Sequence, residues 1–211
     1  FVSFVSNSLF SSLLLLAASQ NFASLAKFQL QLNSQLQMNE AAILADLAIQ
    51  NTLHQASGVF LAGQASSATS HTNSSLNINL GASLGELTFT QLKTSDWLLL
   101  VDKHTPNKFN LLHLDNKTYG KGLSYKSYRP DEVVAERSDT LVDLISQLTW
   151  RFYHPASQQW LTPAEVNDFS QVSAVSYFLT FEAPVLLAGK PSYWHLTKSF
   201  NWGENQQETV P

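Results

Sequence analysis

Residues 1–57 contain neither glycine nor proline, and this absence constrains the fold more than any other feature of the sequence. Glycine and proline are the residues that interrupt helices most strongly. The first glycine, Gly58, stands where a helix C-terminal cap would place it. We therefore expect one continuous helix over residues 1–57, about 85 Å long at roughly 1.5 Å per residue. A domain built from the other residues would be only about 30–40 Å across, so half of this helix needs partners elsewhere.

An apolar stripe with helical spacing begins at Leu25 and continues along the second half of the helix, residues 29–57. Its members recur at intervals of seven, four, seven and four residues and are Leu25, Leu32, Leu36, Ile43 and Leu47. The opposite face holds glutamine, asparagine and the charged residues Lys27, Glu40 and Asp46. We expect the apolar stripe to pack on a β-sheet formed by the rest of the chain.

The first half, residues 1–28, carries no charge before Lys27 and is rich in serine. A signal peptide would use Ala17-Ala18-Ser19 for cleavage but lacks the basic residues that should precede the apolar stretch. A simple membrane anchor needs ~20 apolar residues, whereas only Leu13–Ala18 is an unbroken apolar run. A helix that is first held in a membrane and then packs against similar helices explains both features. Its small residues allow close approach, and its hydroxyls can bond to helix carbonyls.

The remaining sequence predicts a mainly antiparallel sheet, because short strand patterns alternate closely with turns. The expected strands are Ser75–Leu80, Glu86–Leu92, Trp97–Val101, Phe109–Leu114, Leu148–His154, Gln171–Phe181, Pro184–Leu187 and Tyr193–Phe200. Residues 64–75 are expected to form a flexible loop, 138–146 a short helix or an edge strand, and the tail a frayed end. The predicted fold class is α+β, with residues 1–57 as the helix and 58–211 as a β-rich globular domain.

Composition argues against several functions. A net charge of −4 without a basic cluster gives no sign of nucleic-acid contact, and the absence of cysteine excludes disulfide and thiolate chemistry. Charged residues are 13% of the chain, about half the usual share, which suits a protein outside the cytoplasm. No catalytic motif is present, so we expect neither an enzyme nor a cofactor.

Two weak patterns for metal binding remain. His104 and His113 lie near Asp102 and Asp115, but without the ligand spacing of zinc sites. The stretch beginning at Asp115, DNKTYGKG, partly resembles a calcium loop and lacks its third acidic position and closing Glu.

Aromatic residues are concentrated in the C-terminal third. They are Trp150, Tyr153, Trp160, Tyr177, Tyr193, Trp194 and Trp202. Their alternating spacing favours a core role, with a few left for a subunit interface or a ligand groove.

The N-terminal Phe, the charge-free segment and the helix LQLNSQLQMNEAAILADLAIQNTLHQAS at 30–57 resemble the type IV pilin and type II secretion pseudopilin superfamily, in particular PilW-like minor pilins and J-type minor pseudopilins. LTWRFYHPASQQW at 148–160 and VSAVSYFLTFEAP at 172–184 are similar to the paired strands of those proteins. The resemblance covers the first fifty-odd residues well and the rest loosely.

The resemblance implies a structural subunit of a type IV pilus or a type II secretion pseudopilus. Prepilin peptidase would cleave a short leader before Phe1 and methylate the new amine. Residues 1–28 would hold the subunit in the bacterial inner membrane as a single transmembrane segment, then pack with the helices of other subunits in a periplasmic or extracellular filament. The residues implied in this packing are Phe1, Val5, Leu9, Leu13, Leu14, Leu15 and Leu16.

Val5 is a departure from the family pattern, which has Glu at the fifth position to pair with a neighbouring subunit's terminal amine. A subunit at the filament tip has no subunit ahead of it, so the missing Glu points to the tip. The alternative is an anchored surface adhesin or ligand-binding module whose helix is only a stalk.

Overall fold

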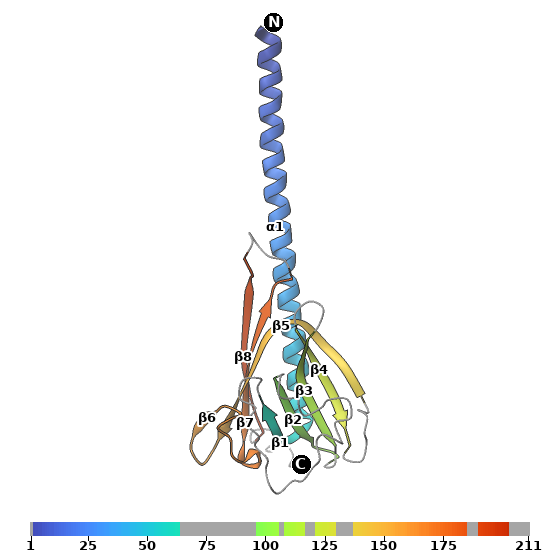
Figure 1. Ribbon diagram of the computed structural model, residues 1–211, viewed down its shortest axis with the longest axis vertical. Helices are drawn as coiled ribbons and strands as arrows, with labels where there is room; N and C mark the ends of the chain where they lie inside the picture. The colour runs from blue at the N-terminus through green and yellow to red at the C-terminus, as the bar shows by residue number, and fades with distance from the viewer. Residues whose placement is uncertain are drawn as a thin grey trace, which may run out of the picture.

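The computed structural model describes residues 2–63, 96–105, 108–116, 121–129, 137–184 and 190–202. In chain order the elements are α1 (Val2–His54), β1 (Ala56–Gly63), β2 (Trp97–Asp102), β3 (Phe109–Asn116), β4 (Lys121–Tyr128), β5 (Arg137–His154), β6 (Gln159–Leu161), the short 3₁₀ helix η1 (Phe169–Gln171), β7 (Ala174–Glu182) and β8 (Tyr193–Asn201). Helix α1 rises far above the rest of the molecule as a single rod (Figure 1). At roughly 1.5 Å per residue it is about 80 Å long.

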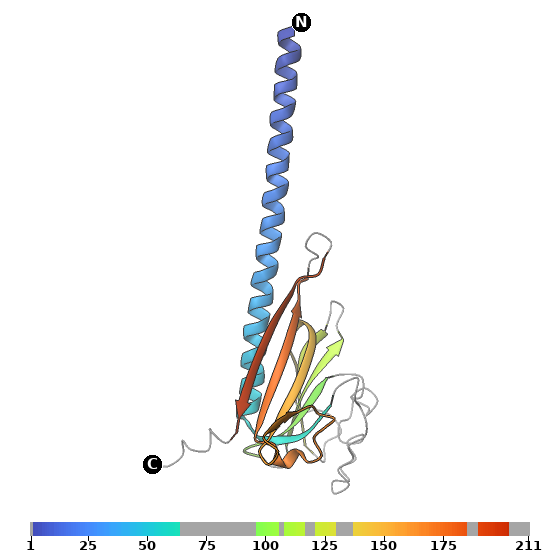
Figure 2. The same cartoon turned by 90° about the vertical axis from the view of Figure 1, so that its left-hand side faces the viewer.

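All eight strands belong to one antiparallel sheet. Its order is β1-β2-β3-β4-β5-β7-β8, and β6 pairs with β5 beside this path. The C-terminal half of α1 lies along one face of the sheet and contacts β5, β1, β8 and β7 (Figure 2). The predicted class, α+β with a long N-terminal helix on an antiparallel sheet, is confirmed at this level.

Strand β5 divides the sheet into two halves because it bends in the middle (Figure 1). Its first part pairs with β4 as far as Ile145, and its second part pairs with β7 from Ile145 onward. At the bend Leu144 has φ 67°, and the pairing with β7 shifts register between Ile145 and Gln147. An extra residue of this kind bends a strand and increases its twist. The segment 138–146 is therefore part of a long strand, which settles the choice between helix and strand.

The buried face of α1 differs from the predicted one. The side chains that pack on the sheet are Ser34, Met38, Ala41, Ala42, Ala45, Ile49, Thr52 and Leu53. The predicted packing residues Leu25, Leu32, Leu36, Ile43 and Leu47 are 46–58% exposed. That prediction is wrong, because the sheet approaches α1 on the side where small residues let the backbones come close. The larger leucines lie on the other side.

The main core lies between α1 and the sheet and takes buried residues from every strand except β6, whose partly buried Leu161 packs against it. A smaller cluster, formed by Trp97, Leu99 and Leu111, is separate from it. The predicted alternation in β5 and β7 is confirmed. Trp150 and Phe152 of β5 are fully buried, as are Tyr177 and Phe181 of β7, while Arg151 is exposed. These four side chains therefore point toward α1, and Arg151 points away.

The helix ends at His54, and the predicted cap Gly58 lies inside β1 instead. The chain enters the sheet early because the Lys103 amide donates to the carbonyl of Gln55 at 2.7 Å. The Trp202 indole also donates to the carbonyl of Ala56 at 3.1 Å. Both bonds come from residues distant in sequence.

The other strand predictions have mixed outcomes. Strands at 97–101, 109–114 and 193–200 are confirmed with extensions of one or two residues. The strand at 148–154 is confirmed as the second part of β5, which begins eleven residues earlier, at Arg137, and β7 begins three residues later than expected, at Ala174. Strands β1, β4 and β6 were not predicted. The predictions for 64–92, for residues 185–187 and for the tail from 203 lie outside the described residues.

Candidate assembly surface

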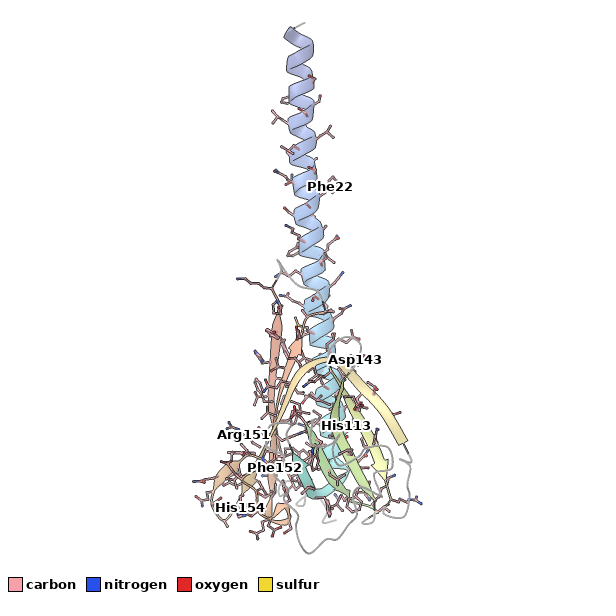
Figure 3. All side chains as sticks on the ribbon, viewed as in Figure 1. Phe22, His113, Asp143, Arg151, Phe152 and His154 are labelled. Carbon is pink, nitrogen blue, oxygen red and sulfur yellow. The ribbon has the colours of Figure 1, made fainter. Side chains whose placement is uncertain are left out.

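The first half of α1 presents its large apolar side chains to solvent. Phe10, Leu13, Leu14, Leu15 and Leu16 are each 56–72% exposed, and Phe22 is 72% exposed. Figure 3 shows Phe22 on the helix, well above the sheet. An exposed apolar surface of this extent marks a site that contacts other proteins or a membrane. Of the other residues expected in filament packing, Phe1 lies outside the described residues, as do the side chains of Val5 and Leu9.

Apolar side chains occur all around this half of the helix, and serines lie between them. Where the serine bonds are described, they run along the helix: Ser19 Oγ donates to the Leu16 carbonyl at 2.8 Å and Ser24 Oγ to the Gln20 carbonyl at 2.9 Å. The predicted bonding of hydroxyls to helix carbonyls is confirmed at these two positions. A serine bonded in this way can lie against another helix without an unsatisfied hydroxyl.

A second exposed surface continues from the first half of α1 down to the level of the sheet. We call it the outer stripe, and it comprises Leu25, Leu32, Leu36, Ile43 and Leu47. At about 100° per residue these positions fall within an arc of roughly 60°, and Leu14 continues the same row. The side chains packed on the sheet lie on the opposite side of the helix. The C-terminal half of α1 is thus apolar on two faces, and the described part of its own domain covers only one of them.

The described part of the chain contains no helical stretch that is both long enough and apolar enough to cross a membrane. Because the side chains of residues 1–7 and 9 lie outside the described part, the expected transmembrane segment at residues 1–28 stays a prediction.

A polar contact fixes the docked half of α1 on the sheet. The Tyr177 hydroxyl, from β7, donates to Asp46 Oδ1 at 2.5 Å, and Gln50 Nε2 donates to the same hydroxyl at 2.9 Å. Burial of the ring and the adjacent Asp46 carboxylate both raise the pKa of Tyr177. Sequence reasoning missed this contact, because Asp46 looked like a solvent-facing charge and Tyr177 like a simple core residue.

The two His–Asp neighbourhoods are separate. His113 is fully buried in β3, and its Nδ1 lies 3.0 Å from Asp115 Oδ1. Asp102 instead closes a turn by accepting from the amides of His104 and Thr105, each at 2.9 Å. No group of three metal-ligating side chains comes together among the described residues. The central residues of the partial calcium loop, 117–120, lie outside them.

The C-terminal aromatic residues fall into two groups. Trp150 and Tyr177 are core residues at 0% exposure, and the partly buried Trp194 and Trp202 pack against that core. Trp160 and Tyr193 are 43% and 50% exposed, and Tyr153 contacts Trp160 with ring centroids 5.4 Å apart. The expected core role therefore holds for the first group, and the second faces solvent.

Comparison of the chain with known protein families and with characterised protein sequences finds no match.

Proposed function

We propose that the chain is a structural subunit of a filament of the type IV pilus or type II secretion pseudopilus kind, and that it assembles through α1. The observation that carries this proposal is the first half of α1, a helix without a domain around it whose large side chains are apolar and exposed. A helix of this kind is stable in water only when other helices or lipid cover it. Copies of similar helices, packed side by side, supply such a cover.

The outer stripe extends the proposed assembly contact into the globular part. Because it lies opposite the docked face, a neighbouring helix can reach it without displacing the sheet. The docked face holds the domain in a fixed orientation through the Asp46–Tyr177–Gln50 contact. In this arrangement the small residues of α1 bind the subunit's own sheet, and the large ones bind other subunits.

The proposed processing and position follow from the family resemblance. Prepilin peptidase acts on the chain before Phe1, and Phe1 carries an N-methyl group in the mature protein. Val5, in place of Glu, suits a subunit at or near the filament tip, where no preceding subunit supplies an amine for the carboxylate. A buried carboxylate without its partner would be costly. Mass spectrometry of the mature N-terminus tests the processing, and a labelled chain seen along the whole filament would contradict the tip position.

The assembly proposal is tested by placing charge on the apolar half of α1. The double variant Leu14→Lys, Leu15→Lys should be absent from filaments sheared from the native host. The reason is that a desolvated lysine between packed helices has no partner for its charge. Ala156→Lys, in the exposed turn between β5 and β6, is the matched control and should assemble normally. Circular dichroism checks that both variants keep the folded domain. Normal filament incorporation of the double variant would overturn the proposal.

The second candidate is a surface adhesin with α1 as a stalk, and the exposed Trp160 and Tyr193 favour it. It predicts ligand binding by the chain in a host without other pilin-like subunits.

A further inference from the structure

The second half of the sheet has an outer face that points away from α1, and exposed aromatic side chains gather there. This face, which we call the outer sheet face, is formed by the second part of β5 with β6, β7 and β8. In the described part of the chain, Trp160 and Tyr193 are the exposed large hydrophobic side chains that do not belong to α1. Both lie on this one face, so their exposure is not scattered over the domain.

The strand register arranges the aromatic groups in a row. Trp160 of β6 lies opposite Tyr153 of β5, which in turn lies opposite Ala174 of β7. Tyr193 of β8 lies opposite Glu182, eight residues further along β7. At roughly 3.3 Å per residue the two ends of the row are about 26 Å apart along the strand direction, and they lie three strands apart across the sheet.

A third aromatic group lies between the two ends of this row. Phe178 of β7 and His195 of β8 stack with their rings 5.4 Å apart and 19° from parallel. The pair is four to six residues from Ala174 along β7, so it stands near the middle of the outer sheet face. The row therefore offers aromatic surfaces at both ends and in the centre.

The positions between the aromatic groups are polar and nearly all neutral. They are Gln147, Thr149, Ser176, Thr197 and Ser199. Hydroxyl and amide side chains both donate and accept hydrogen bonds. The face holds one cation, Arg151, and one anion, Glu182, at opposite ends, so it attracts neither a strongly acidic nor a strongly basic ligand.

We propose that the outer sheet face binds an extended neutral oligosaccharide. A sugar ring combines an apolar C–H surface, which packs on aromatic rings, with a rim of hydroxyls that pair with threonine, serine and glutamine. The alternation of aromatic and neutral polar positions fits this chemistry. The centre of a protein–protein interface is more apolar than its rim, whereas polar positions interrupt the centre of this row. The proposal stands independently of filament assembly.

The test uses the full chain and three neutral tetrasaccharides: chitotetraose, cellotetraose and maltotetraose. At least one should change the tryptophan emission at millimolar concentration, because Trp160 is the most exposed tryptophan in the described residues. Trp160→Ala and Tyr193→Ala should each weaken that binding about tenfold or more. Phe22→Ala, which removes an even more exposed aromatic ring from α1, is the control and should bind normally.

A second variant guards against a folding defect at Trp160. Thr197→Lys places a long cation on the exposed centre of the face without entering the core, and it should also block binding. Failure of all three sugars to change the emission or to bind by calorimetry overturns the proposal. It is equally overturned if the Trp160 and Tyr193 variants bind as well as the wild type. Concentration-dependent self-association that Trp160→Ala abolishes would assign the face to a second copy of the chain instead.

Discussion

Two isoleucines of α1 provide a direct test of which helix face packs on the sheet and which contacts other subunits. Ile49 is 0% exposed and packs in the core, whereas Ile43, six residues earlier, is 58% exposed in the outer stripe. Replacing each by alanine removes the same three carbon atoms from the same helix. We expect Ile49→Ala to reduce domain stability strongly and Ile43→Ala to reduce filament incorporation instead.

The expected magnitudes follow from burial. At about 0.8 kcal/mol per buried carbon, Ile49→Ala loses roughly 2.4 kcal/mol, and the remaining cavity raises the cost to about 3–4 kcal/mol. For Ile43 the partly buried fraction is worth about 1 kcal/mol, and the better helix propensity of alanine returns ~0.4 kcal/mol. The net cost is then about 0.5 kcal/mol. For a chain of this size Ile49→Ala should lower the melting temperature by roughly 6–16 °C.

Thermal unfolding followed by circular dichroism measures the first effect, and the sheared filament fraction from the native host measures the second. Assembly is compared well below the melting temperature of Ile49→Ala, so that both variants are folded. Equal destabilisation by the two substitutions would refute the assignment of faces. A triple variant replaces Leu36, Ile43 and Leu47 by alanine. If both this triple variant and Ile43→Ala were incorporated into filaments normally, the role of the outer stripe would be refuted.

Three further predictions concern the domain. Tyr177→Phe should lower the free energy of unfolding by about 2–3 kcal/mol in a thermal or urea melt, because it leaves the Asp46 carboxylate without its hydroxyl donor. An unchanged melt would contradict the role of this contact. Gly63→Ala should cost about 1–3 kcal/mol in the same melt, since an added Cβ would lie 2.6 Å from Trp97 Nε1, and an unaltered melting point would show that the indole moves freely. Burial would raise the pKa of Asp115, but contacts led by His113 outweigh it and lower the pKa from 3.8 to about 2. The ionised Asp115 carboxylate should therefore stabilise the folded domain by ~1 kcal/mol after allowance for solvent exposure. This stabilisation should be complete above about pH 4 and lost as the pH falls to about 2. Urea melts of Asp115→Asn should therefore differ from wild type at neutral pH and converge near pH 2.

The sequence alone determined the elements whose signal is local. The absence of glycine and proline over residues 1–57 gives a continuous helix, because nothing in the chain interrupts the ladder of backbone bonds. Alternating side chains around Trp150 and Tyr177 give two strands with a buried and an exposed face, because the strand repeat itself separates them. Strand β4, with the sequence KGLSYKSY, gave no such signal, since its pairing with β3 and β5 rather than its own residues makes it a strand.

Only the tertiary structure decided which side of α1 the sheet covers. Hydrophobicity favoured the leucines of the outer stripe as the face that packs on the sheet. Close approach to a sheet instead favours small side chains such as Ala41 and Ala45, which contribute little to an apolar pattern in the sequence. The contact that orients the helix joins Tyr177 to Asp46, which is 131 residues away in sequence. The bend at Leu144 likewise depends on different neighbours, β4 before it and β7 after it. Contacts between distant segments set all three features, and no local pattern records them.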